Sequence, residues 1–149
     1  MVQPSPRAVG LIALGGALGS VGRYAVETAI PFSPTPAASG LPWATLLVNV
    51  TGALAMGLLV AWLTAHPAPP PWVRPLAAVG LLGGWTTYSA FAAETHRLWS
   101  AGAPGVSAAY ILGSVAAGLL AVIAGALAGG RIWRSDRAEL DAEEVTEGA

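Results

Sequence analysis

The sequence contains little charge and no cysteine. Of its 149 residues, 54% are hydrophobic and only 10% are charged, whereas roughly a quarter of the residues in a soluble domain carry a charge. Before residue 136 the only acids are Glu27 and Glu94. So few charges cannot cover a surface that faces water, and we therefore expect an integral membrane protein. The formal net charge of −1 argues against a nucleic-acid partner.

The residues that build common catalytic and metal sites are also scarce. Without cysteine there is no disulfide framework and no thiolate metal ligand, and the two histidines lack the spacing of a metal-binding pair. Ser89 and Ser114 have no histidine at a comparable predicted depth, so the sequence brings no nucleophile and base together. We expect a protein that is not an enzyme.

Four apolar stretches are each long enough to cross a membrane as a helix, which takes about 20 residues. They cover residues 8–30, 41–65, 73–99 and 106–132. Prolines, which a helix interior does not tolerate, follow the first two stretches and precede the fourth. We predict an all-α membrane domain of four helices over residues 1–133, followed by an acidic, disordered tail over residues 134–149.

The arginines are divided unequally between the two predicted ends of these helices. Four spans place both termini on one side of the membrane, and five arginines lie on that side (Arg7, Arg74, Arg131, Arg134 and Arg137). Arg23 and Arg97 lie towards the other side. The positive-inside rule then favours cytoplasmic termini. The bias is mild, and insertion in both orientations stays open.

Residues 83–91, Gly-Gly-Trp-Thr-Thr-Tyr-Ser-Ala-Phe, place a polar cluster inside the third span. Paired glycines weaken a helix, and irregular backbone at membrane depth is tolerated only where protein or a water-filled cavity receives it. We therefore predict that the third helix is broken near Gly83–Thr86 and that a polar species crosses the membrane there. Trp85, at mid-depth, is expected to pack between helices. Elsewhere, small residues four apart, such as Gly15 and Gly19, predict close helix packing.

Asn49 is the most informative single residue. It lies early in the second span and shares a helix face with Thr45 and Gly52. An amide buried in hydrocarbon without partners costs several kcal/mol. Asn49 therefore either hydrogen-bonds a neighbouring helix or offers an uncharged N–H donor to an anion.

The other polar and aromatic residues of the spans each admit two interpretations. Tyr88 and Phe91 are i,i+3 neighbours that either pack together or present their positive ring edges to an anion. Tyr110 and Ser114 share a face that either packs or lines a polar path. Glu94 is either an intramembrane functional carboxylate or a residue that faces an aqueous vestibule.

Arg23 and Glu27 complete the charged residues of the membrane body. Their i,i+4 spacing permits an ion pair. Alternatively, Arg23 attracts an anion towards the mouth of a path.

Three motifs occur in a specific order along the spans. They are GGALGSVGRY at 15–24, TLLVNVTG at 45–52 and GGWTTYSAFAAE at 83–94, with Tyr110 and Ser114 following in the fourth span. In this order and spacing, over about residues 10–130, they resemble the Fluc (CrcB) family of fluoride channels. Each motif alone is moderately specific, whereas the ordered set is highly specific.

The resemblance implies a fold and an assembly. Two subunits would pack antiparallel in the cell inner (plasma) membrane, with two fluoride pores at the dimer. The partner would be a second copy in dual topology or an oppositely oriented homologous chain. A structural sodium ion at the dimer centre would be held by the main-chain carbonyls of Gly83 and Thr86. Fluoride that entered as HF would leave the cytoplasm passively.

The resemblance also implies the roles of individual residues. The fluoride pore falls on Asn49, Tyr88, Phe91, Thr45, Tyr110 and Ser114, and the vestibule falls on Glu94 and Arg23. Tyr88 stands where phenylalanine is usual, and Gly118 stands where some members carry a further serine.

Two other functions suit four small membrane helices. A proton-coupled drug exporter would need a carboxylate at the membrane centre, and Glu27, which lies late in its span beside Arg23, suits that role poorly. A non-conducting assembly subunit would carry no ion flux.

Overall fold

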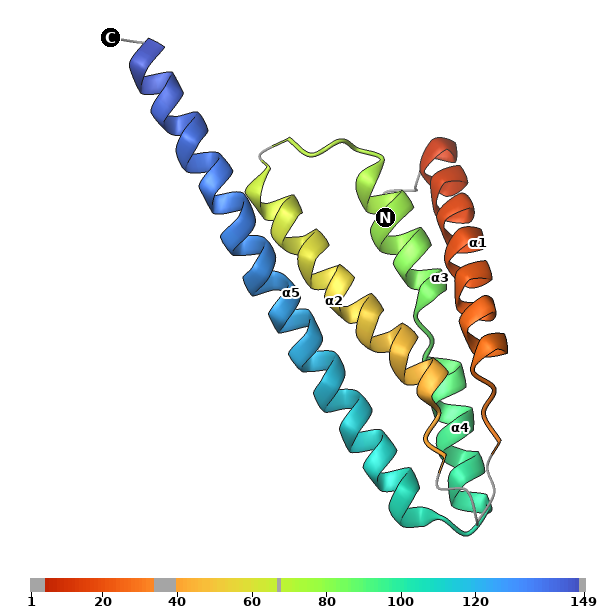
Figure 1. The fold of residues 1–149 in the computed structure, drawn as a ribbon. Coiled ribbons are helices and arrows are strands. Elements are labelled where there is room, and N and C mark those ends of the chain that lie inside the picture. Colours follow the sequence, from red (N-terminus) through yellow and green to blue (C-terminus); the bar gives the residue numbers. More distant parts are fainter. Residues whose placement is uncertain (1–4, 34–39, 67, 148–149) are drawn as a thin grey trace.

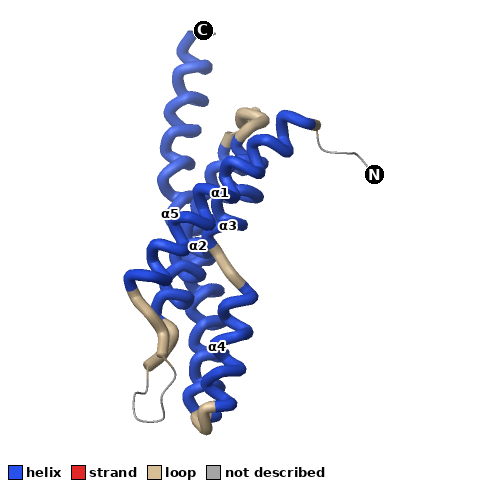
Figure 2. The backbone as a smooth tube through the Cα atoms, turned by 90° about the vertical axis from the view of Figure 1, so that its right-hand side faces the viewer, coloured by secondary structure: helices blue, strands red, loops and turns tan. Residues whose placement is uncertain are grey.

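The computed structural model describes residues 5–33, 40–66 and 68–147. In chain order its elements are α1 (Pro6–Ala29), α2 (Trp43–Ala65), the π-helix η1 (Arg74–Leu82), the short helix α3 (Gly83–Trp85), α4 (Tyr88–Ser100) and α5 (Pro104–Glu147). All regular structure within these ranges is helical, which confirms the predicted all-α class (Figures 1 and 2).

Four helical segments of the described chain are long and apolar enough to cross a membrane. They are Pro6–Ala29, Trp43–Ala65, Arg74–Ser100 and Pro104–Trp133. The predicted spans agree with these bounds to within a few residues. The start of α1 and the end of α5 lie at the same end of the molecule, as four spans require (Figure 1). The protein is a multi-pass membrane protein.

Local sequence explains where the helices begin and turn. The Ser5 side chain caps α1 by accepting the Ala8 N–H at 3.2 Å, and Pro6 occupies the first helical position, where its missing donor is not needed. Between α4 and α5, Gly102 adopts a φ of 79°, a backbone conformation that favours glycine. The last two spans are therefore joined by a tight turn.

The helices pack mainly as two pairs, with α2 along α5 and α1 along η1 and α3 (Figure 1). Small residues allow the close approach within each pair. A Cβ atom on Gly57 of α2 would collide with the Val122 carbonyl of α5, and a Cβ on Gly19 of α1 would collide with the Leu81 carbonyl. Lipid provides no hydrophobic drive between helices, so close backbone contact stabilises each pair.

The third span changes conformation twice. It begins as a nine-residue π-helix, a form that often occurs near functional sites. Gly83 is still helical, but Thr86 and Thr87 are extended, with ψ angles of 155° and 122°. The helix resumes at Tyr88, where the Thr87 hydroxyl caps α4 by accepting the Ala90 N–H at 3.1 Å. Figure 2 shows this interruption as a loop between α3 and α4.

The fourth span continues as helix beyond its predicted end. The sequence predicts a disordered tail from residue 134, whereas α5 extends to Glu147. Alanine, glutamate and arginine are frequent in this segment, and all three are strong helix formers. The last two residues of the predicted tail lie outside the described residues. The division into a membrane domain and a tail at residue 133 stays a prediction.

The most buried side chains gather where α2, α4 and α5 meet. Thr45 and Val48 of α2 and Ser107 of α5 are fully buried, and Tyr110 is 2% exposed. The Ser107 hydroxyl donates to the Thr95 carbonyl of α4 at 3.0 Å. This packed junction holds the first turns of α2 and α5 against α4, the part of the third span that follows the interruption.

Candidate functional site

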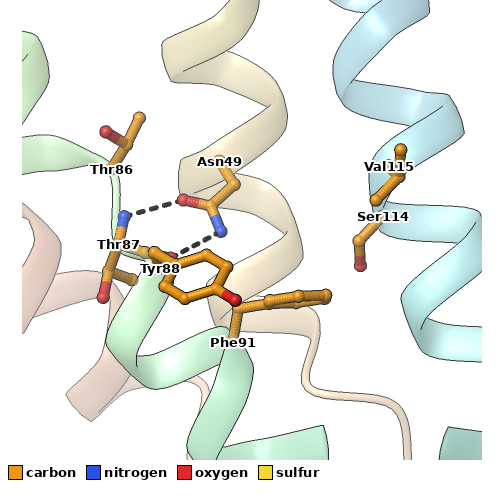
Figure 3. A pocket seen from close by; sticks show the side chains of 7 residues that line it. All are labelled: Asn49, Thr86, Thr87, Tyr88, Phe91, Ser114 and Val115. Atoms are coloured by element: carbon orange, nitrogen blue, oxygen red, sulfur yellow. Dashed lines mark hydrogen bonds between the residues drawn. The ribbon is translucent and has the colours of Figure 1, made fainter.

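The side-chain amide of Asn49 hydrogen-bonds both backbone groups of Thr87, its N–H and its carbonyl. Its Oδ1 accepts the Thr87 N–H at 2.8 Å, and its Nδ2 donates to the Thr87 carbonyl at 3.0 Å (Figure 3). Extended backbone between two helices lacks helical partners, and a side-chain amide can satisfy both of its groups. The second N–H of the amide makes no hydrogen bond with the described residues. The two interpretations of Asn49, a hydrogen bond to a neighbouring helix and a donor for an anion, are therefore compatible. One N–H binds the third span, and the other is not used by the described residues.

A cavity of about 350 Å³ opens beside this pair. Three elements and the interruption contribute to its wall, which consists of Asn49, Thr86, Thr87, Tyr88, Phe91, Ser114 and Val115 (Figure 3). None of these side chains carries a charge. The cavity thus brings together, at membrane depth, four of the six residues that the sequence predicts for a pore.

The Ser114 hydroxyl is buried and lacks a hydrogen-bond partner within the described part of the chain. Such a group costs about 1–3 kcal/mol relative to a paired one. Ser114 lies on α5, across the cavity from Asn49 (Figure 3). The hydroxyl is therefore a hydrogen-bond donor that the described residues around the cavity leave unused.

Three aromatic rings lie next to one another at this site. The Phe91 ring lies 6.0 Å from the Tyr88 ring and 5.3 Å from the Tyr110 ring, measured between centroids, and each pair is tilted by 46°. Tilted rings expose positive edges as well as negative faces. The Tyr88 side chain is 81% exposed, so its ring and hydroxyl are accessible from outside this chain.

Glu94 joins three helices at the buried junction. The Thr45 hydroxyl of α2 donates to its Oε1 at 2.8 Å, and the Tyr110 hydroxyl of α5 donates to its Oε2 at 2.9 Å. Both hydroxyls belong to the predicted pore set, but neither lines the cavity beside Asn49. Within this chain they bind a carboxylate, so their first role is to hold Glu94 between α2 and α5.

Arg23 connects the first span to the interrupted third span. It forms the ion pair with Glu27 that the spacing permits, at 3.0 Å. Its Nε also donates to the Gly84 carbonyl at 3.1 Å. Carbonyls at a helix C-terminus lack helical partners and interact favourably with a cation. Arg23 therefore stabilises the end of α3, a contact between residues distant in sequence that no local pattern reveals.

Gly83 and Thr86 border a second cavity, of about 380 Å³, whose wall also includes Asn49. The described residues contain no cluster of histidine, cysteine or acidic side chains that could hold a metal ion. A cation at this place would therefore take oxygen ligands from the backbone, which suit hard cations. Two carbonyls alone form an incomplete coordination shell for such a cation.

Sequence reasoning missed one contact across the interruption. The indole N–H of Trp85 donates to the Thr51 hydroxyl of α2 at 3.0 Å. Thr51 stands in a run of apolar residues and resembles an ordinary packing position. No signal in the sequence distinguishes it.

The fold and the site together define a small multi-pass membrane protein in which uncharged donors and aromatic rings line a cavity at membrane depth. A family model described as CrcB-like protein, Camphor Resistance (CrcB), matches residues 10–126. The chain belongs to the CrcB family, as the order of its motifs predicts.

Individual relatives support the same assignment. The chain is 48% identical over 118 residues to the fluoride-specific ion channel FluC of Paracoccus denitrificans, a match that covers 79% of this chain and 90% of that protein. It is 43% identical over 115 residues to FluC of a Chelativorans species, with 77% and 90% covered. It is 42% identical over 114 residues to FluC 2 of Nocardia farcinica, with 76% and 79% covered.

Proposed function

We propose that this protein is a fluoride-selective ion channel that lowers cytoplasmic fluoride by passive export. Its family membership and the names of its relatives support fluoride as the ion. The observation that supports the proposal is an uncharged cavity whose wall includes the Asn49 amide, with one N–H that no described residue accepts, and Ser114, whose hydroxyl has no hydrogen-bond partner among the described residues. No enzymatic step is part of this function.

Neutral donors suit the chemistry of fluoride. The ion is small and strongly hydrated, so a pore must replace its water with other hydrogen-bond donors. A pore must also bind an ion firmly enough for entry and weakly enough for exit. Amide and hydroxyl donors with the ring edges of Tyr88 and Phe91 meet both needs, because they stabilise the anion without a full ion pair.

The remaining predicted residues contribute around this cavity. Thr45 and Tyr110 hold Glu94, and we propose that the three extend the polar path towards a vestibule. Arg23 is proposed to contribute positive charge to a vestibule while it anchors the end of α3.

We further propose a dimer of antiparallel subunits with two pores. The cavity beside Asn49, with its few polar groups, is open at the surface of one chain, and the accessible Tyr88 forms part of its wall. Hydrocarbon does not satisfy polar groups, so a second protein surface has to cover them. The partner is a second copy in dual topology or an oppositely oriented homologous chain, in the cell inner membrane.

A structural sodium ion at the dimer centre completes the proposal. The carbonyls of Gly83 and Thr86 would hold it, with ligands from the partner subunit. When bound, the ion would supply a positive charge that stabilises the partial negative charge of these backbone oxygens at membrane depth. Residues of this chain already satisfy the neighbouring carbonyls, since Arg23 binds Gly84 and Asn49 binds Thr87.

The proposal is tested by purified protein in liposomes loaded with fluoride, with efflux followed by a fluoride electrode. We expect rapid efflux that empty liposomes do not show. An absence of efflux would favour a non-conducting assembly subunit and would contradict the proposal. The drug-exporter alternative predicts proton-dependent uptake of a lipophilic cation, but Glu27 is engaged by Arg23.

A further inference from the structure

Trp85 forms a directional contact with α2. Its indole N–H donates to Thr51 Oγ1 at 3.0 Å, and the same hydroxyl lies 2.7 Å from the Leu47 carbonyl of its own helix. An indole can only donate, and a hydroxyl can donate and accept at once. The Thr51 hydroxyl thus donates to the backbone carbonyls of its own helix, to Leu47 at 2.7 Å and to Val48 at 3.2 Å, and its oxygen accepts the indole N–H.

Two glycines make room for the Trp85 ring. A Cβ atom on Gly22 of α1 would lie 2.9 Å from the ring atom Cζ3, and a Cβ on Gly52 of α2 would lie 3.1 Å from Cδ1. Both distances are tighter than ordinary carbon contacts. The ring therefore occupies a slot between the first and second spans that larger residues at these two positions would close.

The contact is in register with the Asn49 pair. Asn49 binds Thr87, and two residues later in α2 Thr51 binds Trp85, two residues earlier in the third span. The two contacts therefore match the antiparallel course of the two segments. Thr86 lies between these two points, and a Cβ on Gly52 would collide with its side chain. The extended segment is held from α2 at both ends.

This inference rests on the proposed function and deepens it. We propose that Trp85 is a positioning residue for conduction, which acts with Thr51 to hold Thr86 and Thr87 extended against α2. Without the Trp85 contact, Asn49 is the only described α2 residue that still hydrogen-bonds the segment. The segment then samples other conformations, and the Asn49 amide binds Thr87 for less of the time. The orientation of the second Asn49 N–H is then no longer fixed.

Four variants test this role through fluoride flux. Trp85→Phe removes the N–H, Thr51→Val removes the acceptor with little change of shape, and Thr51→Ser keeps the hydroxyl. Thr64→Val is the matched control, because the Thr64 hydroxyl bonds only the Ala61 carbonyl of its own helix. We expect flux about threefold to tenfold lower in the first two variants, the factor that corresponds to one hydrogen bond, and flux near the wild-type value in the last two.

The double variant Trp85→Phe, Thr51→Val separates a shared contact from two independent effects. We expect it to conduct like either single variant, because both substitutions remove the same bond. Multiplied losses would overturn the proposal. So would wild-type flux in folded Thr51→Val protein, which also decides the matter if Trp85→Phe fails to fold.

A spectroscopic test does not depend on conduction. The chain has six tryptophans, and in protein labelled with ¹⁵N-tryptophan the Trp85 indole signal is identified by its loss in Trp85→Phe. We expect Thr51→Val to shift this signal and Thr51→Ser to leave it near its wild-type position. An unchanged signal in Thr51→Val would overturn the contact. If wild-type protein conducts no fluoride but the signal shifts as expected, the proposed function fails and the contact stands.

Discussion

The side-chain amide of Asn49 binds both backbone groups of Thr87, at 2.8 Å and 3.0 Å, and so joins α2 to the extended segment of the third span. This pairing uses the amide oxygen and one of its two N–H groups. The same residue therefore organises the interruption and supplies a donor to the cavity beside it.

Asn49→Asp is expected to abolish fluoride flux. The carboxylate cannot donate to the Thr87 carbonyl, and it places negative charge in the wall of an anion path. The measurement is efflux from proteoliposomes, with Thr64→Val as a control at the far end of the same helix. Efflux from Asn49→Asp at the wild-type rate would contradict the role of Asn49.

Tyr88→Phe isolates the hydroxyl that this chain adds at the cavity. A hydrogen bond to a charged group contributes about 1.5–3 kcal/mol, so its loss should raise the half-saturating fluoride concentration by a factor of roughly ten to one hundred. Tyr24→Phe is the matched control, because Tyr24 is also exposed but does not line the cavity. Identical concentration dependence in the two variants would exclude the hydroxyl from ion binding.

Ser114→Ala should affect stability and flux in opposite directions. Removal of a buried, unpartnered hydroxyl is expected to raise the free energy of unfolding by about 1 kcal/mol without fluoride, while the lost donor slows flux. Ser107→Ala is the contrasting variant, since it breaks a bond to the Thr95 carbonyl and should lower stability by about 1 kcal/mol. Denaturation in detergent measures both, and a destabilised Ser114→Ala would show that the hydroxyl has a partner.

Phe91→Ile is expected to slow flux more than Ser100→Ala. Isoleucine keeps much of the apolar volume but has no ring edge to offer an anion. Ser100 lies at the end of α4, outside the cavity wall. Efflux rates of the two variants, measured at equal protein density, provide the comparison, and equal rates would count against ring edges as part of the path.

The four spans could be predicted from the sequence because a membrane helix is defined by apolar length, and prolines mark the ends. Asn49 stood out because an amide in hydrocarbon requires partners. The partner of Thr45 and Tyr110 could not be predicted, because Glu94 lies on another helix and spacing within one helix says nothing about its neighbours. The Trp85–Thr51 contact was hidden for the same reason. Helix α5 extends past residue 133 because helix propensity there is high, although composition predicted disorder.

The central claim is that uncharged donors in this chain conduct fluoride selectively. It is tested most directly in liposomes that contain purified protein and equal concentrations of fluoride and chloride, with both ions followed by electrodes in the same sample. We expect fast fluoride efflux while chloride stays inside. Equal release of the two ions, or retention of both, would contradict it.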